Sequence, residues 1–284
     1  MRTRFIPAVL AIAVLAAAQS SLYRAADFGK EHDFAIGIEG PAVDRDGNLY
    51  VLNLHADGNV ARVRPDGSAE LFVELPKGST PNGTRFHSDG SMLLADYSGH
   101  NVLRVDMKTK VVSVWAHEPR MNQPNDLAIT RNNTLFASDP NWDTNTGNLW
   151  RISPDRKVTL MEANMGTTNG IEVSPDDRYI YVNESIQKKV WRYDLHPDGS
   201  LSNKRLFAQF FDFGMDGMRC DRRGNLYIAR YGKGSVVVLS PEGKPIREVQ
   251  LKGKNPTNLT FSKDYKMVYV TIQDRGMLEK FAVK

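Results

Sequence analysis

Six polar residues recur through the 284-residue chain at intervals of 42 to 47 residues, and each opens a short run of apolar residues. All six carry a side-chain oxygen that could bind a metal ion or a substrate. They are Glu39, Asn82, Asn125, Asn169, Asp216 and Asn258. Two carboxylates and several amides brought to one point would form a hard-cation site, because Ca²⁺ takes roughly six to eight oxygen ligands.

A simpler explanation exists for each residue taken singly. Asn-Gly and Asp-Gly pairs are common in turns, where Asn tolerates left-handed backbone. Turn formation does not account for Glu39, and it gives no reason for an oxygen at all six positions. Without a cation, Glu39 and Asp216 would repel each other at close range, and one would tend to take up a proton. We therefore expect one divalent cation, Ca²⁺ first, with Mg²⁺, Mn²⁺ and Zn²⁺ as alternatives; zinc is disfavoured because the set holds no His or Cys.

Short β-strands are the elements that would bring these residues together. Each residue begins a strand–turn–strand unit, such as EGPAVDRDGNLYVLN from Glu39 or DGMRCDRRGNLYIAR from Asp216. Third and fourth apolar runs follow, and a period of about 40 residues is the size of a four-stranded propeller blade. The pattern predicts an all-β fold, a six-bladed β-propeller with four antiparallel strands per blade and a central metal site. The last blade lacks a fourth strand, which we expect from residues 28–38.

The first residues differ in kind from the rest of the chain. Arg2 and Arg4 precede an apolar, Ala-rich run from Phe5 to Ala18, which is typical of a secretory signal. We expect a signal peptide within residues 1–26, cleaved near residues 18–26, and a single propeller domain over residues 27–284. The run is short for a membrane span, which needs about 20 apolar residues; an uncleaved anchor is the alternative. Either way we expect an exported protein, periplasmic or secreted, with no stable membrane partner.

Composition argues against several function classes. The net charge is +4 and no long Lys/Arg run occurs, so a nucleic-acid partner is not expected. Cys220 is the only cysteine, which excludes an intramolecular disulfide, and its strand position predicts a small buried apolar side chain. The chain has no GxSxG nucleophile elbow, P-loop or dinucleotide motif. The expected partner is a small-molecule substrate, and the oligomeric state stays open.

Four motifs taken together resemble the SMP-30/gluconolactonase/luciferin-regenerating-enzyme family. They are Glu39-Gly40, Pro124-Asn125-Asp126, Asn169-Gly170 followed by Ser174-Pro175-Asp176, and Asp216-Gly217-Met218. The resemblance covers about residues 30–284. It implies a six-bladed propeller with one divalent cation in the central channel, and the activity of a sugar lactonase or a related organophosphate hydrolase.

The resemblance also implies roles for individual residues. Glu39, Asn125, Asn169 and Asp216 would bind the cation, and Asp216 would be catalytic as a base or a nucleophile. Asn125, Gln123 and Asn82 would contact the substrate. Gln123 stands where some lactonases of the family have an Arg that contacts sugar hydroxyls, so specificity for a sugar lactone does not follow.

These features favour an exported, Ca²⁺-dependent hydrolase that opens a sugar lactone or a related lactone, with Asp216 assisting the attack of water. One alternative is a non-catalytic binding or scaffold propeller with a structural metal. Another is a hydrolase of other esters or phosphotriesters. A long insertion, residues 139–145 with Trp142, would either cover the pocket as a lid or form only a surface loop.

Overall fold

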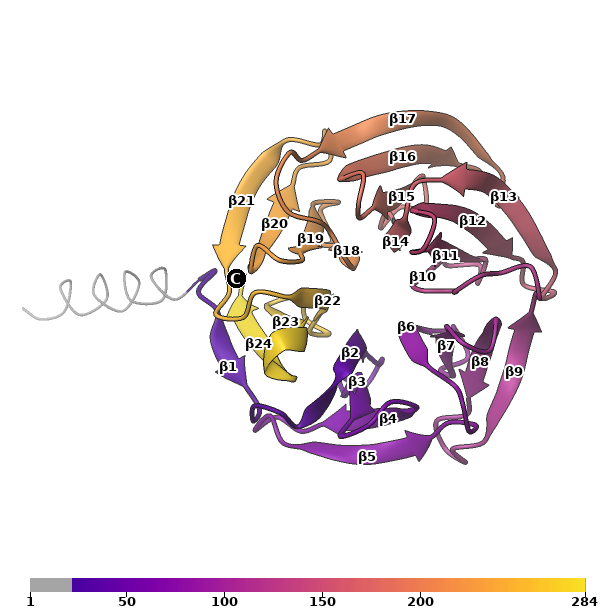
Figure 1. The fold of residues 1–284 in the computed structure, drawn as a ribbon. Helices are drawn as coiled ribbons and strands as arrows, with labels where there is room; N and C mark the ends of the chain where they lie inside the picture. The colour runs from indigo at the N-terminus through magenta and orange to yellow at the C-terminus, as the bar shows by residue number, and fades with distance from the viewer. Residues whose placement is uncertain (1–21, 284) are drawn as a thin grey trace, which may run out of the picture.

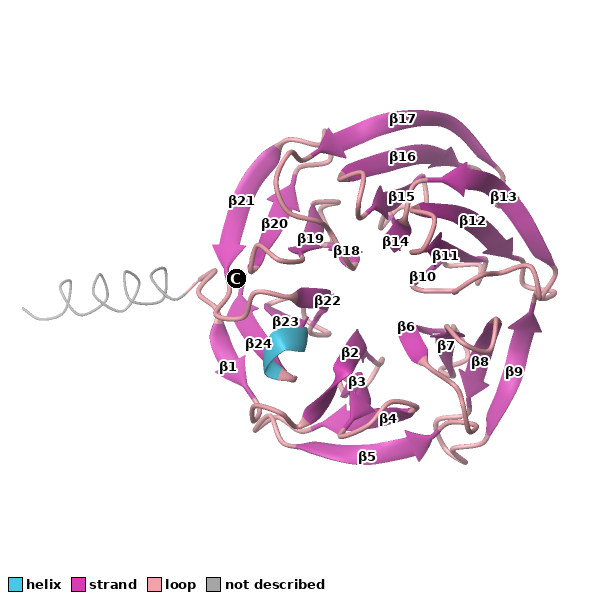
Figure 2. Ribbon diagram, in the orientation of Figure 1, coloured by secondary structure: helices cyan, strands magenta, loops and turns pink. Residues whose placement is uncertain are grey.

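A computed structural model describes residues 22–283 of the chain. Six four-stranded sheets stand around a central axis as the blades of a propeller (Figure 1). The predicted fold class is therefore confirmed. The described residues contain one helical turn, the 3₁₀ helix η1 (Gln273–Arg275), which is cyan in Figure 2. The predicted signal peptide lies outside the described residues up to position 21. In residues 22–283 no helix has the length and apolar character needed to cross a membrane.

Strands follow chain order from the axis outward in blades one to five. Blade one contains β2 (Phe34–Val43), β3 (Leu49–Leu54), β4 (Asn59–Val63) and β5 (Ala69–Glu74). Blade two contains β6 (Pro81–Phe86), β7 (Met92–Asp96), β8 (Asn101–Val105) and β9 (Val112–His117). Blade three contains β10 (Leu127–Ile129), β11 (Leu135–Asn141), β12 (Thr146–Ile152) and β13 (Val158–Met165). Blade four contains β14 (Thr168–Val173), β15 (Tyr179–Glu184), β16 (Lys189–Leu195) and β17 (Leu201–Gln209). Blade five contains β18 (Met218–Cys220), β19 (Leu226–Arg230), β20 (Ser235–Leu239) and β21 (Pro245–Gln250).

Blade six joins the two ends of the described chain. It contains β22 (Pro256–Phe261), β23 (Met267–Ile272), β24 (Met277–Ala282) and, outermost, β1 (Ala26–Phe28). β1 runs antiparallel to β24, so a strand from the start of the described chain completes the last blade. The expectation that residues 28–38 supply this strand is wrong in position, because only Phe28 of that segment belongs to β1, whereas residues 34–38 belong to β2, which pairs with β3.

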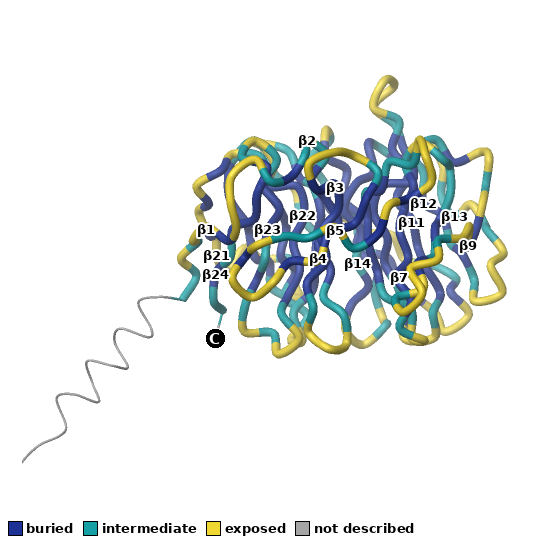
Figure 3. Tube along the Cα trace, turned by 90° about the horizontal axis from the view of Figure 1, so that it is seen from below, coloured by how far each residue is buried: buried dark blue, intermediate teal, exposed yellow. Residues whose placement is uncertain are grey.

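Burial decreases from the axis to the rim. Every residue of β3 and β7 is buried, whereas β21 buries only Val249. The apolar clusters bridge neighbouring blades: one joins Tyr227 of blade five to Leu259 and Phe281 of blade six. Figure 3 shows this buried interior between two exposed loop faces. Packing between blades therefore fixes the innermost strands, and the residues at their ends, around the axis. Cys220 is buried in one such cluster, as predicted.

Hydrogen bonding at the start of the innermost strands shows which residues are equivalent. Asp126 and Asn258 each accept a hydrogen bond from the next backbone N–H, at 2.8 and 2.9 Å. The backbone N–H of each also donates to a hydroxyl oxygen of the second strand, that of Ser138 or Thr271. The two residues thus occupy the same place in blades three and six, and the blade starts are the residues before them, Asn125 and Thr257. The prediction of Asn258 as the sixth start is wrong by one residue. It relied on the amide side chain of Asn258, whereas the register of the strands places Thr257 at the start.

Candidate functional site

A cavity of about 700 Å³ opens at the axis on the face where the innermost strands begin. Its floor is formed by the six blade starts. They are Glu39, Asn82, Asn125, Asn169, Asp216 and Thr257. The structure thus brings together five of the six residues singled out in the sequence, although more than 170 residues separate the first from the last of the five.

Glu39 and Asp216 are the two carboxylates of this floor. Glu39 is buried, and its Oε2 accepts a hydrogen bond from the Gly40 N–H at 3.0 Å. Asp216 is partly exposed to the cavity. Among residues 22–283, no Lys or Arg forms an ion pair with either acid. Desolvation, followed by repulsion from Glu39, raises the pKa of Asp216 well above its ordinary value, and desolvation raises the pKa of Glu39 as well.

Asn125 and Asn169 add two buried carbonyl oxygens without a hydrogen-bond partner. Nδ2 of Asn169 donates to Oγ of Ser185 at 3.0 Å, and the Ser185 hydroxyl donates in turn to the carbonyl of Met215. This chain orients the Asn169 amide. A buried carbonyl left unpaired costs about 1–3 kcal/mol, so these oxygens need a ligand.

The floor residues fit a divalent cation. Two uncompensated carboxylates need positive charge, and the unpartnered amide oxygens supply the hard ligands that Ca²⁺ prefers. No cluster of three or more His, Cys, Asp or Glu side chains occurs in the described part of the chain. On the floor, Glu39, Asn125, Asn169 and Asp216 are the residues that would hold such an ion.

The raised pKa values give a prediction for the cation-free protein. Burial raises the pKa of Glu39 from 4.5 to about 8. The folded protein therefore binds this proton more tightly than the unfolded chain does, and the resulting contribution to the free energy of unfolding is fully present below pH 4.5 and lost as the pH rises through 8. Since one pKa unit corresponds to about 1.4 kcal/mol, we expect the free energy of unfolding in chelator to fall by several kcal/mol between pH 6 and pH 8.5. Urea unfolding at both pH values measures this.

Two controls accompany that measurement. Saturating Ca²⁺ should remove most of the pH dependence, because it favours the ionised carboxylates, and Glu39→Gln should weaken the dependence in chelator. Equal stability of the cation-free protein at both pH values would contradict the electrostatic description of the floor.

Four charged residues form a second layer in the channel beneath the floor, which we call the channel network. Arg85 lies 3.3 Å from Asp126 (Nη1 to Oδ1) and 3.0 Å from Glu172 (Nη2 to Oε2). Arg219 Nη1 lies 3.2 Å from the other Asp126 oxygen. Arg85, Asp126 and Arg219 are buried. The network balances two positive and two negative charges, and it also places the Asp126 charge near the acids above, where it adds to their raised pKa values.

Sequence reasoning missed the channel network although a signal for it exists. Arg85, Glu172 and Arg219 are each the third residue after a blade start, in the strings NGTR, NGIE and DGMR. Residues at one position of several innermost strands lie close together at the axis. The alignment of the repeats therefore could have predicted that these charged residues meet there.

The cavity walls come from the loops between the second and third strands. Tyr97, Trp142, Ile186 and Tyr231 lie in these loops of blades two to five and line the cavity. In blade six the same place is taken by Gln273 of η1. The prediction of a long insertion at residues 139–145 is wrong, because residues 139–141 belong to β11 and the remaining loop, residues 142–145, is as short as its counterparts in the other blades. Trp142 in this loop lines the cavity wall.

Asp139 of β11 anchors the segment that precedes β10. Its carboxylate accepts hydrogen bonds from the backbone N–H groups of Asn122 and Gln123, at 2.7 and 2.6 Å, and from Trp150 Nε1 at 2.8 Å. Gln123 is therefore held beside this anchor and does not line the cavity, unlike Asn82 and Asn125.

Comparison with known proteins gives a family and a fold. Residues 38–274 match the model of the SMP-30/Gluconolactonase/LRE-like region. A gluconolactonase of Zymomonas mobilis is 27% identical over 241 residues, which cover 72% of this chain and 67% of that protein. The diisopropyl-fluorophosphatase of Loligo vulgaris is 24% identical over 277 residues, 86% of this chain and 88% of that one.

A solved structure agrees with the fold. The calcium-binding protein regucalcin from Agrobacterium tumefaciens superposes with a TM-score of 0.78 at 22% identity, covering 90% of this chain and 93% of that chain. At this identity the likeness speaks for the propeller architecture alone. The family match spans all six blade starts on the cavity floor, from Glu39 to Thr257. The chain belongs to the SMP-30/gluconolactonase/LRE-like family.

Proposed function

We propose that the protein is a Ca²⁺-dependent lactonase. The observation that carries the proposal is the cavity floor, where two uncompensated carboxylates and two unpartnered amide oxygens converge at the axis. A gluconolactonase among the relatives, and a calcium-binding protein among the structural neighbours, support it. A divalent cation bound there would polarise a substrate carbonyl and stabilise the negative charge that develops on its oxygen.

Each residue of the floor has its own role in the proposed reaction. The Asp216 carboxylate, which is open to the cavity, accepts the proton of the attacking water; a base in this position contributes about 10²–10⁴-fold to the rate. Asn125 and Asn169 orient their amide oxygens toward the axis. Glu39, fixed by the Gly40 N–H, supplies the second negative charge. Asn82 completes the floor and is placed to contact the substrate.

Substrate turnover tests the proposal. The purified protein with saturating Ca²⁺ should hydrolyse a panel of γ- and δ-lactones, and excess chelator should lower the rate by at least about 10²-fold, since the charge-stabilising group is lost. Restoring Ca²⁺ should restore the rate. Calcium-dependent melting with no turnover of any lactone would instead identify a binding propeller with a structural metal.

A second candidate is a phosphotriester hydrolase, because the squid diisopropyl-fluorophosphatase aligns over most of the chain. In that reaction Asp216 would attack phosphorus directly, so its oxygen would enter the product. Hydrolysis of a phosphotriester in ¹⁸O-labelled water separates the two roles: single-turnover incorporation of ¹⁶O from the enzyme indicates direct attack.

We further propose that the protein is exported. The support is the pattern of residues 1–26, with a basic start and an apolar run. Mass determination of the intact protein from the producing cells tests this, and an unprocessed chain in the cytoplasm would contradict it.

A further inference from the structure

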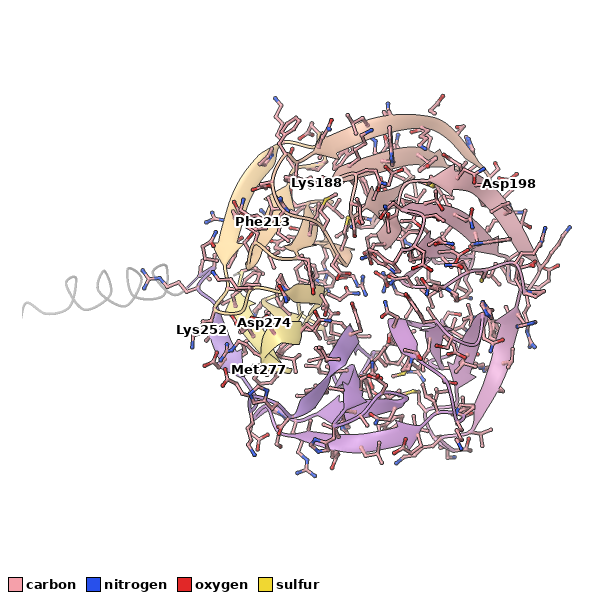
Figure 4. The ribbon with its side chains drawn as sticks, in the orientation of Figure 1. Lys188, Asp198, Phe213, Lys252, Asp274 and Met277 are labelled. Carbon is pink, nitrogen blue, oxygen red and sulfur yellow. The ribbon has the colours of Figure 1, made fainter. Side chains whose placement is uncertain are left out.

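Large apolar side chains that are exposed to solvent fall into two groups. One group lies on or beside the outermost strands, as Leu71 and Ile246 do. The other lies on the face around the cavity, in β2 or in the loops between strands. This second group contains Ile36, Trp142, Ile186, Phe211, Phe213 and Tyr231. Phe213 and Lys188 are labelled in Figure 4 on the side of the axis occupied by blades four and five.

Three of these residues also line the cavity. Trp142, Ile186 and Tyr231 are 37, 49 and 36% exposed and belong to the cavity wall, so they form its entrance. Deeper in, Ile38, Tyr97 and Met215 continue the apolar wall down to the oxygens of the floor. A continuous apolar path therefore leads from the solvent to the proposed reaction centre.

Several polar groups that line the cavity already have a hydrogen-bond partner within the protein. The Thr257 hydroxyl donates to the carbonyl of Ile38 at 2.8 Å. Thr80 pairs with Ser98 at 2.8 Å, and the Tyr231 hydroxyl donates to Gln273. A substrate with many hydroxyl groups would find few free partners above the floor, and each hydroxyl buried without one weakens binding. Within residues 22–283, the Lys188 ammonium forms no ion pair, and it is one of the few polar groups of the wall that remain free for a substrate.

The cavity is also larger than a lactone ring requires. Its volume of about 700 Å³ falls within the roughly 300–1,000 Å³ of pockets that enclose drug-sized ligands. With the ring at the floor, the rest of the space faces apolar side chains and opens between Trp142, Ile186 and Tyr231.

We propose that this site selects lactones that carry an apolar alkyl substituent, rather than polyhydroxylated sugar lactones, with the substituent lying against Ile186, Trp142 and Tyr231. The inference rests on the proposed lactonase function and names its substrate class. Burial of each methylene should raise kcat/KM by roughly three- to fourfold until the chain reaches the entrance.

A chain-length series tests the proposal. We would measure kcat/KM for γ-butyrolactone, for γ-lactones with ethyl, butyl and hexyl substituents, and for glucono-1,5-lactone, each corrected for spontaneous hydrolysis. We expect a rise of at least 100-fold from the unsubstituted to the hexyl lactone, and a rate for gluconolactone well below that of the hexyl lactone. A flat series with gluconolactone preferred would overturn the inference and leave the lactonase proposal intact.

A matched pair of variants locates the effect. Ile186→Ser should lower kcat/KM for the hexyl lactone by about tenfold and flatten the series. Ile246→Ser removes a side chain of equal size and similar exposure, 53%, from β21 on the outer rim, and should leave the series unchanged. Equal behaviour of the two variants would overturn the assignment of Ile186.

If no lactone is hydrolysed, the lactonase proposal itself is refuted. The preference of the cavity for apolar substituents is then tested by binding alone. Calorimetry with γ-lactams that carry the same substituents measures their affinity for the cavity without turnover. Affinity that does not change with chain length would then overturn the inferred preference.

Discussion

Asp216→Asn should lower kcat for lactone hydrolysis by about 10³-fold at saturating Ca²⁺. Asn has nearly the same shape and keeps one oxygen for the cation, but it cannot accept the proton of the attacking water, and a base of this kind is worth about 10²–10⁴-fold. Asp216 is the floor carboxylate that is exposed to the cavity, which separates it from the more deeply buried Glu39.

Calcium titration must accompany this measurement, because loss of one carboxylate also weakens the cation site. Rates are therefore compared at the plateau of the titration. Asp198→Asn is the matched control: Asp198 is an aspartate of a surface turn that holds the Ser200 N–H at 2.9 Å, far from the axis in Figure 4, and its loss should leave kcat unchanged. Full activity of calcium-loaded Asp216→Asn would remove Asp216 from the mechanism.

Arg85→Met should lower the free energy of unfolding by about 3–5 kcal/mol, because removing one member of a buried ionic network strands the opposite charges. Arg85 Nη2 contacts both Glu172 and the carbonyl of Ile171, at 3.0 and 3.1 Å, from blade two to blade four across the channel. Without it, Glu172 keeps only the Cys220 N–H at 3.2 Å, and Asp126 depends on Arg219 alone for charge.

An exposed ion pair provides the control for this loss. Arg64 pairs with Glu70 on the rim of blade one with both side chains well exposed, so Arg64→Met should cost less than about 1 kcal/mol. Chemical denaturation of the three proteins at one calcium concentration compares the effects. A cost for Arg85→Met as small as that for Arg64→Met would mean that the channel network does not hold the blades together.

The repeat period made most of the fold predictable. Apolar alternation, turn residues and a spacing near 43 residues indicated six four-stranded units, and the same alignment brought Glu39 and Asp216 to one axis. For locating the blade starts, side-chain type was less reliable than strand register where the two disagreed. Asn258 carries the expected amide, yet its side chain bonds to its own strand, and Thr257 reaches the cavity instead.

Other features depend on contacts between blades that no local pattern contains. The short strand β1 has only three residues, so its propensity could not distinguish it from neighbouring segments, and its place is set by pairing with β24. The segment before β10 is held by Asp139 of β11, whose partners lie up to 17 residues away in sequence. For the channel network, charged residues within strands suggest a solvated face until the six copies are placed around one axis.

The metal content of the purified protein shows whether the cavity floor is a calcium site. We expect one equivalent of calcium per chain in the purified protein, bound through the oxygens of Glu39, Asp216 and the floor amides. Chelation should remove the metal together with lactonase activity, and stoichiometric calcium should restore both. A protein that contains no metal after dialysis against calcium, or that hydrolyses lactones equally well with and without it, would contradict the account.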